Sequence, residues 1–320
     1  QPSADPLKEV ERKMRKFLHM LVGISLVAAA PLAAQDSPAA LIIRVQGDVQ
    51  IRQGGAAPGP ATAGARLSVG DEVLPGTGAR ATLIVPSGAT QQITEATTVR
   101  APQGGTTGDL FQRAMATLAQ AASTDATAGG RQGMIRPIPG QTALVLPRNG
   151  LTINSDRPTF VWTASEGQIY ELMLRKVDGG RPEIFEIGTD TTWTYPDDLE
   201  PLEFGATYSW TIFVGGRRGG RPLPQQEFRV IDIVAFAELT SFMDEIQLLG
   251  LDPMDDGLFL TVVALRDLEL FYDADQAMND LEGQGGMSGD LYMLRGEILN
   301  TLGREADARV AFDKADAIMR

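Results

Sequence analysis

The residues that carry most enzyme chemistry are scarce in this chain. Its 320 residues contain one histidine, His19, and no cysteine. Ser-His-Asp triads, Cys-His pairs and zinc sites of the Cys/His type all need those side chains. Carboxylates alone can hydrolyse glycosides, but the sequence sets no pair of acids among aromatic strands. We therefore predict that the protein is not an enzyme, and we assign no catalytic, cofactor-binding or metal-binding residue.

One acidic run, DPMDDG, has a superficial likeness to a calcium loop. Its carboxylates are Asp252, Asp255 and Asp256. A calcium loop also needs a ligand at its third position and a bidentate glutamate at its twelfth. Those positions hold Met254 and Val263. The sequence therefore does not predict a calcium site.

The stretch Met14–Ala34 predicts an export signal that also contains the lone histidine. A short positive start is followed by the apolar residues 17–30, a proline and small residues. That order is typical of a cleavable secretory signal, and we expect cleavage between Ala34 and Gln35. Residues 1–13 are polar and show no pattern. Together, residues 1–34 form a predicted leader.

The charge of the chain is strongly negative and unevenly distributed. The formal net charge is −13, and it becomes −15 once residues 1–34 are removed. Residues 232–320 hold 19 Asp/Glu against 6 Lys/Arg. Such a block does not bind nucleic acid through phosphates. It is either a solvated helical surface or a docking face for a basic partner. Without cysteine, no disulfide supports the exported chain, so each domain needs its own core.

Residues 41–100 predict a small β domain, because short apolar runs alternate with Gly/Pro-rich turns. Three motifs resemble the FecR family: Gly47-Asp48-Val49, then the turn from Gly64 to Asp71, then the run from Thr77 to Gly88. The best-known role that this resemblance implies is signalling from outer-membrane transporters to a sigma factor. That role requires a spanning helix.

Residues 101–141 predict a linker that contains one short helix. Paired glycines and Pro137-Ile138-Pro139-Gly140 indicate flexible or extended chain. Within it, Asp109 can cap a helix with an apolar face. We expect this helix to pack on a neighbouring domain; binding a partner is the alternative.

Residues 142–231 predict an immunoglobulin-like sandwich, since about seven short strands alternate apolar and polar residues. The runs Arg157–Trp162, Tyr170–Leu172 and Leu202–Ile212 resemble fibronectin type III-like modules of bacterial envelope proteins. Trp162 and Trp210 are expected in the core. For Trp193 the alternative to a place in the core is an exposed ring that binds sugar.

Residues 232–320 predict a helical domain, because the apolar period lengthens to between three and four. The last two helices resemble a tetratricopeptide (TPR) repeat. Small Gly296 and Ala308 imply close helix contact, and Phe312 fills the groove between repeats. A degenerate copy precedes this repeat, and Ala235–Leu249 is expected to cap the pair. The positions that match the repeat are Tyr292, Gly296, Leu299, Gly303, Ala308, Phe312 and Ala315.

Taken together, the predicted fold is multidomain β plus α: a FecR-like domain, a fibronectin-like sandwich and TPR-like helical hairpins. This order predicts a non-enzymatic periplasmic or cell-envelope scaffold that binds a protein partner through residues 232–320. A carbohydrate-binding envelope module, directed to peptidoglycan, is one alternative. A membrane-anchored signalling regulator is another, and it requires residues 17–34 to stay uncleaved as an inner-membrane anchor.

Overall fold

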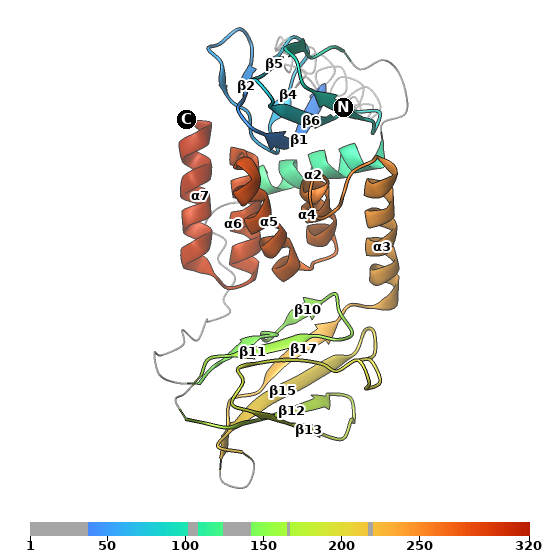
Figure 1. Cartoon of the computed structure of the whole chain (residues 1–320), viewed down its shortest axis with the longest axis vertical. Helices are drawn as coiled ribbons and strands as arrows, with labels where there is room; N and C mark the ends of the chain where they lie inside the picture. Colours follow the sequence, from blue (N-terminus) through green and yellow to red (C-terminus); the bar gives the residue numbers. More distant parts are fainter. Residues whose placement is uncertain (1–37, 102–107, 124–141, 165–166, 217–219) are drawn as a thin grey trace, which may run out of the picture. The chain divides into compact units, whose positions relative to one another are not determined.

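The computed structural model describes residues 38–101, 108–123, 142–164, 167–216 and 220–320. Residues 38–320 belong to a single structural unit. The predicted leader and most of the predicted linker lie outside the described residues. Figure 1 labels many of the helices and strands named below.

The first module is a β-sandwich made of two four-stranded sheets. One sheet has the order β4-β1-β6-β7 and the other has the order β3-β2-β5-β8. Short strands meet at tight turns. Gly47 lies in one of them with a positive φ of 77°, and a Cβ at this position would come within 3.0 Å of the Cβ of Ala79. The strands are β1 (Ala40–Gln46), β2 (Val49–Arg52), β3 (Gly59–Pro60), β4 (Arg66–Leu67), β5 (Glu72–Pro75), β6 (Arg80–Ile84), β7 (Thr90–Ile93) and β8 (Thr97–Thr98).

The sheet that contains β1 and β6 is buried on both faces. Alternate residues of a strand point to opposite faces. Ile42 belongs to the core between the two sheets, whereas Leu41 and Ile43 belong to the cluster that contains the helices. This explains why β1 is an almost continuous apolar run rather than an alternating one.

The second module is the fibronectin-like sandwich. One sheet has the order β14-β11-β9, and the other has the order β10-β17-β15-β12-β13, with β16 paired to β15. The chain changes sheet between β9 and β10, so that β10 runs parallel to β17. The strands are β9 (Leu144–Leu146), β10 (Leu151–Ile153), β11 (Thr159–Trp162), β12 (Tyr170–Lys176), β13 (Glu183–Gly188), β14 (Thr192–Thr194), β15 (Thr207–Val214), β16 (Arg221–Pro222) and β17 (Gln226–Val230).

The third module is helical. It comprises five helices that follow the sandwich, together with α2, which precedes the sandwich in the sequence. Asp232 caps the first of the five by accepting hydrogen bonds from the backbone of Val234 and Ala235. The helices are α2 (Asp109–Ser123), α3 (Ile233–Leu248), α4 (Leu258–Asp267), α5 (Phe271–Gly285), α6 (Gly289–Thr301) and α7 (Glu305–Met319).

Candidate interaction site

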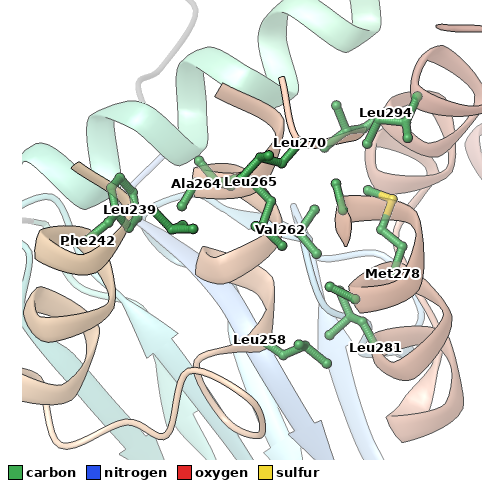
Figure 2. Close-up of a cluster of buried hydrophobic side chains, with 14 of the residues drawn as sticks. Leu239, Phe242, Leu258, Val262, Ala264, Leu265, Leu270, Met278, Leu281 and Leu294 are labelled. Carbon is green, nitrogen blue, oxygen red and sulfur yellow. The ribbon is translucent and has the colours of Figure 1, made fainter. Parts of the chain in front are cut away.

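Helix α2 packs against α4 and α6. Its buried face contributes Leu110, Phe111, Ala114 and Leu118 to the same core cluster as those helices. Figure 2 shows part of this cluster, with side chains from α3, α4, α5 and α6 converging beside the pale green helix. The chain's own helix therefore covers the sides of α4 and α6 that it contacts. A partner must bind another surface or displace α2.

Polar contacts fix α2 at the margin of its buried face. Arg113 pairs with Glu238 of α3 at 3.3 Å, and its guanidinium lies 5.1 Å from the centre of the Phe242 ring. Thr117 donates a hydrogen bond to Asp267 of α4 at 3.3 Å. These contacts tie α2 to two of the five later helices, in addition to the apolar contact with α6.

A buried carboxylate joins three helices of this region. Asp275 of α5 is completely buried, and its two oxygens accept from Arg295 of α6 at 3.4 Å and from Arg304 at 2.5 Å. Arg304 directly precedes α7. A buried charge is tolerated only when it is paired in this way. We assign this network to holding α5, α6 and α7 together.

A second carboxylate of the network, Glu282, is strongly acidic. Burial alone would raise its pKa, but hydrogen bonds from Lys314, Tyr292 and Arg295 outweigh that effect and lower the pKa to about 2. Burial, together with the hydrogen bond to Glu282, raises the pKa of Tyr292 to about 12. Neither group changes its protonation near neutral pH, so the pair is suited to structure rather than to proton transfer.

The pKa of Asp273, in the first turn of α5, is shifted in the opposite direction from that of Glu282. Burial raises its pKa to about 6, while a hydrogen bond with its own backbone acts the other way. The folded protein therefore keeps a proton that the unfolded chain loses near pH 4. The stabilisation that this group contributes is present at low pH and is lost as the pH rises through about 4 to 6.

Asp273→Asn is therefore expected to raise the free energy of unfolding at pH 7 by about 1–2 kcal/mol, and by much less at pH 4. The full shift is discounted here because the side chain is half-buried and solvent screens it. Urea unfolding at the two pH values measures the difference. Asp280→Asn, on the exposed side of the same helix, is the control. Equal effects of Asp273→Asn at both pH values would contradict the shift.

The acids of the DPMDDG run dock the first β module onto the helices. Arg44 of β1 pairs with Asp255 at 2.8 Å and with Asp256 at 3.7 Å. Asp252 instead accepts a backbone hydrogen bond from Met254 in the turn before α4. The geometry therefore gives Asp255 and Asp256, but not Asp252, a role between modules.

A second docking point lies where the β3–β4 loop meets the start of α6. The backbone N–H of Ser288 donates to the carbonyl of Ala63 at 2.8 Å, and Arg66 pairs with Asp290 at 3.0 Å. Between them, Gly64 has a φ of 80°, and a Cβ there would come within 2.6 Å of the Ser288 hydroxyl oxygen. Only glycine satisfies both the backbone conformation and the close approach.

The tryptophans of the sandwich serve mainly as core. Trp162 and Trp210 are buried, as the sequence pattern predicts, and the Trp210 indole donates to the carbonyl of Pro147 at 2.8 Å. Trp193 is half-buried, with its ring 4.5 Å from that of Phe185 and 5.9 Å from that of Tyr195. Packing of this kind leaves less of Trp193 for stacking on a sugar ring.

The first β module contains a cleft of about 760 Å³ between strands of its two sheets. Its floor is apolar, with Val73, Leu83 and Ile93, and Gln91 and Arg100 add polar groups. The cleft has no aromatic lining, so it offers no stacking surface for a sugar.

The outer side of α3 is exposed along the helix and carries an apolar residue near each end. Val234, Ala237, Ser241, Glu245 and Leu248 follow one another at intervals of three or four and are all exposed. They lie opposite the buried residues Leu239, Phe242 and Ile246 of the same helix. We call these five exposed residues the α3 outer face. The sequence predicted a capping helix over Ala235–Leu249 and gave no role to its outer side.

Within the described residues, no group of three or more His, Cys, Asp and Glu side chains is arranged to hold a metal ion. Among the helices that the structure describes, none combines the length and apolar character needed to cross a membrane.

Comparison with known proteins gives matches among solved structures. No family model matches the chain, and no curated protein matches it. Solved structures that match include the fibronectin type III domain of human fibronectin type III domain containing protein 3, at 20% identity over 32% of this chain and 94% of that domain, with a TM-score of 0.21.

Two further solved structures match. The FN1–FN3 domains of chicken CNTN1 match at 8% identity, over 61% of this chain and 65% of that one, with a TM-score of 0.21. A cytokine receptor complex matches at 12% identity, over 59% of this chain and 95% of that one, also with a TM-score of 0.21. The strand pairing, rather than these scores, defines the second module as a fibronectin type III-like sandwich.

Proposed function

We propose that this protein is a non-enzymatic scaffold of the bacterial cell envelope that binds a protein partner through its helical region, residues 232–320. The observation that carries the proposal is the shared core. One buried cluster contains Leu41 of the first β module, Leu118 of α2, Trp210 of the sandwich and Phe259 of α4. Modules joined in this way can present their surfaces together, which is what a scaffold requires.

The envelope location rests on the export signal predicted at residues 14–34. The choice of the helical region as the binding part rests on its surface, where acids and exposed apolar side chains occur together. Such mixtures mark interaction surfaces more often than an evenly charged surface does.

Affinity capture tests the proposal. The chain from Gln35 onward, which keeps every described residue, is immobilised and exposed to the envelope fraction of the cells that produce it, at about 50 mM and about 300 mM salt. The fragment 232–320 is unsuitable, because without α2 and β1 it exposes the core it shares with them.

We expect one defined protein to be retained in near-stoichiometric amount, with weaker retention at the higher salt concentration because the helical region is acidic. Resin carrying an unrelated protein of similar net charge is the control. Retention of nothing at either salt concentration, or of the same proteins as the control, would contradict the proposed function.

A further inference from the structure

Exposed apolar side chains are frequent on α3 and in the turn that follows it, and two of them, Val234 and Leu248, belong to the α3 outer face. Eleven large apolar residues are exposed among the residues that the structure describes, and five of them lie between positions 233 and 254. Val234 is 72% exposed and Leu248 is 87% exposed, at opposite ends of the α3 outer face. Single exposed apolar residues are ordinary, but a concentration of them indicates a surface that is covered by something. The five are Ile233, Val234, Phe236, Leu248 and Met254.

The charged residues of this segment itself are all of one sign. Residues 232–265 contain seven Asp and Glu and no Lys or Arg. Glu238, Asp255 and Asp256 are paired with arginines from α2 and β1. Asp244 and Glu245, next to Leu248, are exposed and form no ion pair with any described residue. Their charges are therefore available to a positively charged partner.

The shape of the face suits a helix. Between its apolar ends, the α3 outer face carries Ala237, Ser241 and Glu245. The small side chains of Ala237 and Ser241 let a second helix approach closely. The 16 residues of α3 extend over about 24 Å, which is the length of an ordinary partner helix.

We propose that the α3 outer face binds an amphipathic helix of another protein, with apolar residues on one side and Lys or Arg beside them. This inference rests on the proposed function and specifies the surface and the partner's chemistry. The apolar stripe would cover Val234 and Leu248, and the cations would pair with Asp244 and Glu245.

A second copy of this chain is the competing occupant, through its own α7. That helix exposes Val310, Ile318 and Met319. Its charges are of both signs, however, since Asp313 and Asp316 accompany Lys314. It complements the uniformly acidic α3 less well than a basic helix does, and the test separates the two.

The probe is a synthetic helix of about 18 residues, with leucines on one side and lysines on the other, titrated by fluorescence anisotropy into the chain from Gln35 onward. A matched peptide carries glutamate in place of every lysine. We expect the lysine peptide to bind, the glutamate peptide not to bind, and binding to weaken with salt.

Two pairs of variants locate the binding site. The double substitution Asp244→Lys and Glu245→Lys is expected to weaken binding about tenfold. The matched control is the double substitution Glu305→Lys and Asp313→Lys, at two exposed residues of α7. It is expected to change the affinity for the lysine peptide less than about threefold. Leu248→Ala is expected to weaken binding of the lysine peptide about tenfold. Val69→Ala is the control, because Val69 is an exposed residue of the first β module, and it is expected to leave binding unchanged.

Several results would overturn this inference: no binding of the lysine peptide, equal binding of both peptides, or equal losses in the α3 and α7 variants. Concentration-dependent self-association in sedimentation velocity that Leu248→Ala abolishes would assign the face to a second copy instead. If envelope capture retains the same protein with the Asp244/Glu245 variant, the proposed function stands and the α3 assignment fails. If the unmodified chain retains nothing, the proposed function itself fails.

Discussion

Asp275→Ala is expected to lower the free energy of unfolding by about 3 kcal/mol, the largest effect of any single substitution considered for this protein. Asp275 is completely buried, and its carboxylate is shared by Arg295 and Arg304. Its removal leaves the guanidinium groups of Arg295 and Arg304 partly desolvated and without the carboxylate that they share. Breaking a buried pair from one side costs more than the pair itself contributes.

Urea unfolding followed by circular dichroism measures this loss. Asp307→Ala is the matched control, because Asp307 also pairs with Arg304, at 2.8 Å, but its side chain is 52% exposed. An exposed pair is worth less than about 1 kcal/mol. Equal losses in the two variants would show that Asp275 does not hold the three helices together.

Gly296→Ala is expected to lower the free energy of unfolding by about 1–3 kcal/mol, although alanine is the better helix former. The reason is the packing of α6 on α7. A Cβ at position 296 would overlap the ring of Phe312. Adding the Phe312→Leu substitution is expected to recover part of the loss, because the two positions share one contact.

Gly283→Ala is the control for helix propensity. Gly283 also lies within a helix, α5, but a Cβ there meets nothing within 4 Å. It is expected to raise the free energy of unfolding by about 0.5–1 kcal/mol. An increase in the free energy of unfolding with Gly296→Ala, like the one expected with Gly283→Ala, would contradict the close contact between α6 and α7.

Much of the fold follows from local sequence pattern. In residues 142–231, alternation predicted the strands because each strand of a sandwich has one face in the core. Phe160, Trp162 and Trp210 are buried accordingly. The longer apolar period after residue 232 likewise predicted a helical C-terminal region, which the structure contains.

The assembly of the modules could not be predicted in this way. An apolar stripe on α2 indicates that one face is buried, but it does not indicate which helices bury it. The ion pair between Arg44 and Asp255 joins positions 211 apart in the sequence. Surface charges such as these have the same local pattern whether they face solvent or another module.

The α3 outer face was missed for a related reason. Val234 and Leu248 were obscured by the stronger pattern of Leu239, Phe242 and Ile246 on the buried side. A helix with apolar residues on both sides, in a segment without Lys or Arg, was the signal that could have indicated a covered surface.

Site-specific photo-cross-linking in the producing cells tests most directly whether this protein is a scaffold that binds its partner through α3. A photoreactive residue is placed at Leu248 of α3, and separately at Val69 of the first β module, both of which are exposed. We predict one discrete adduct with another protein from position 248 and none from position 69. The same adducts from both positions, or no adduct from position 248, would contradict this account.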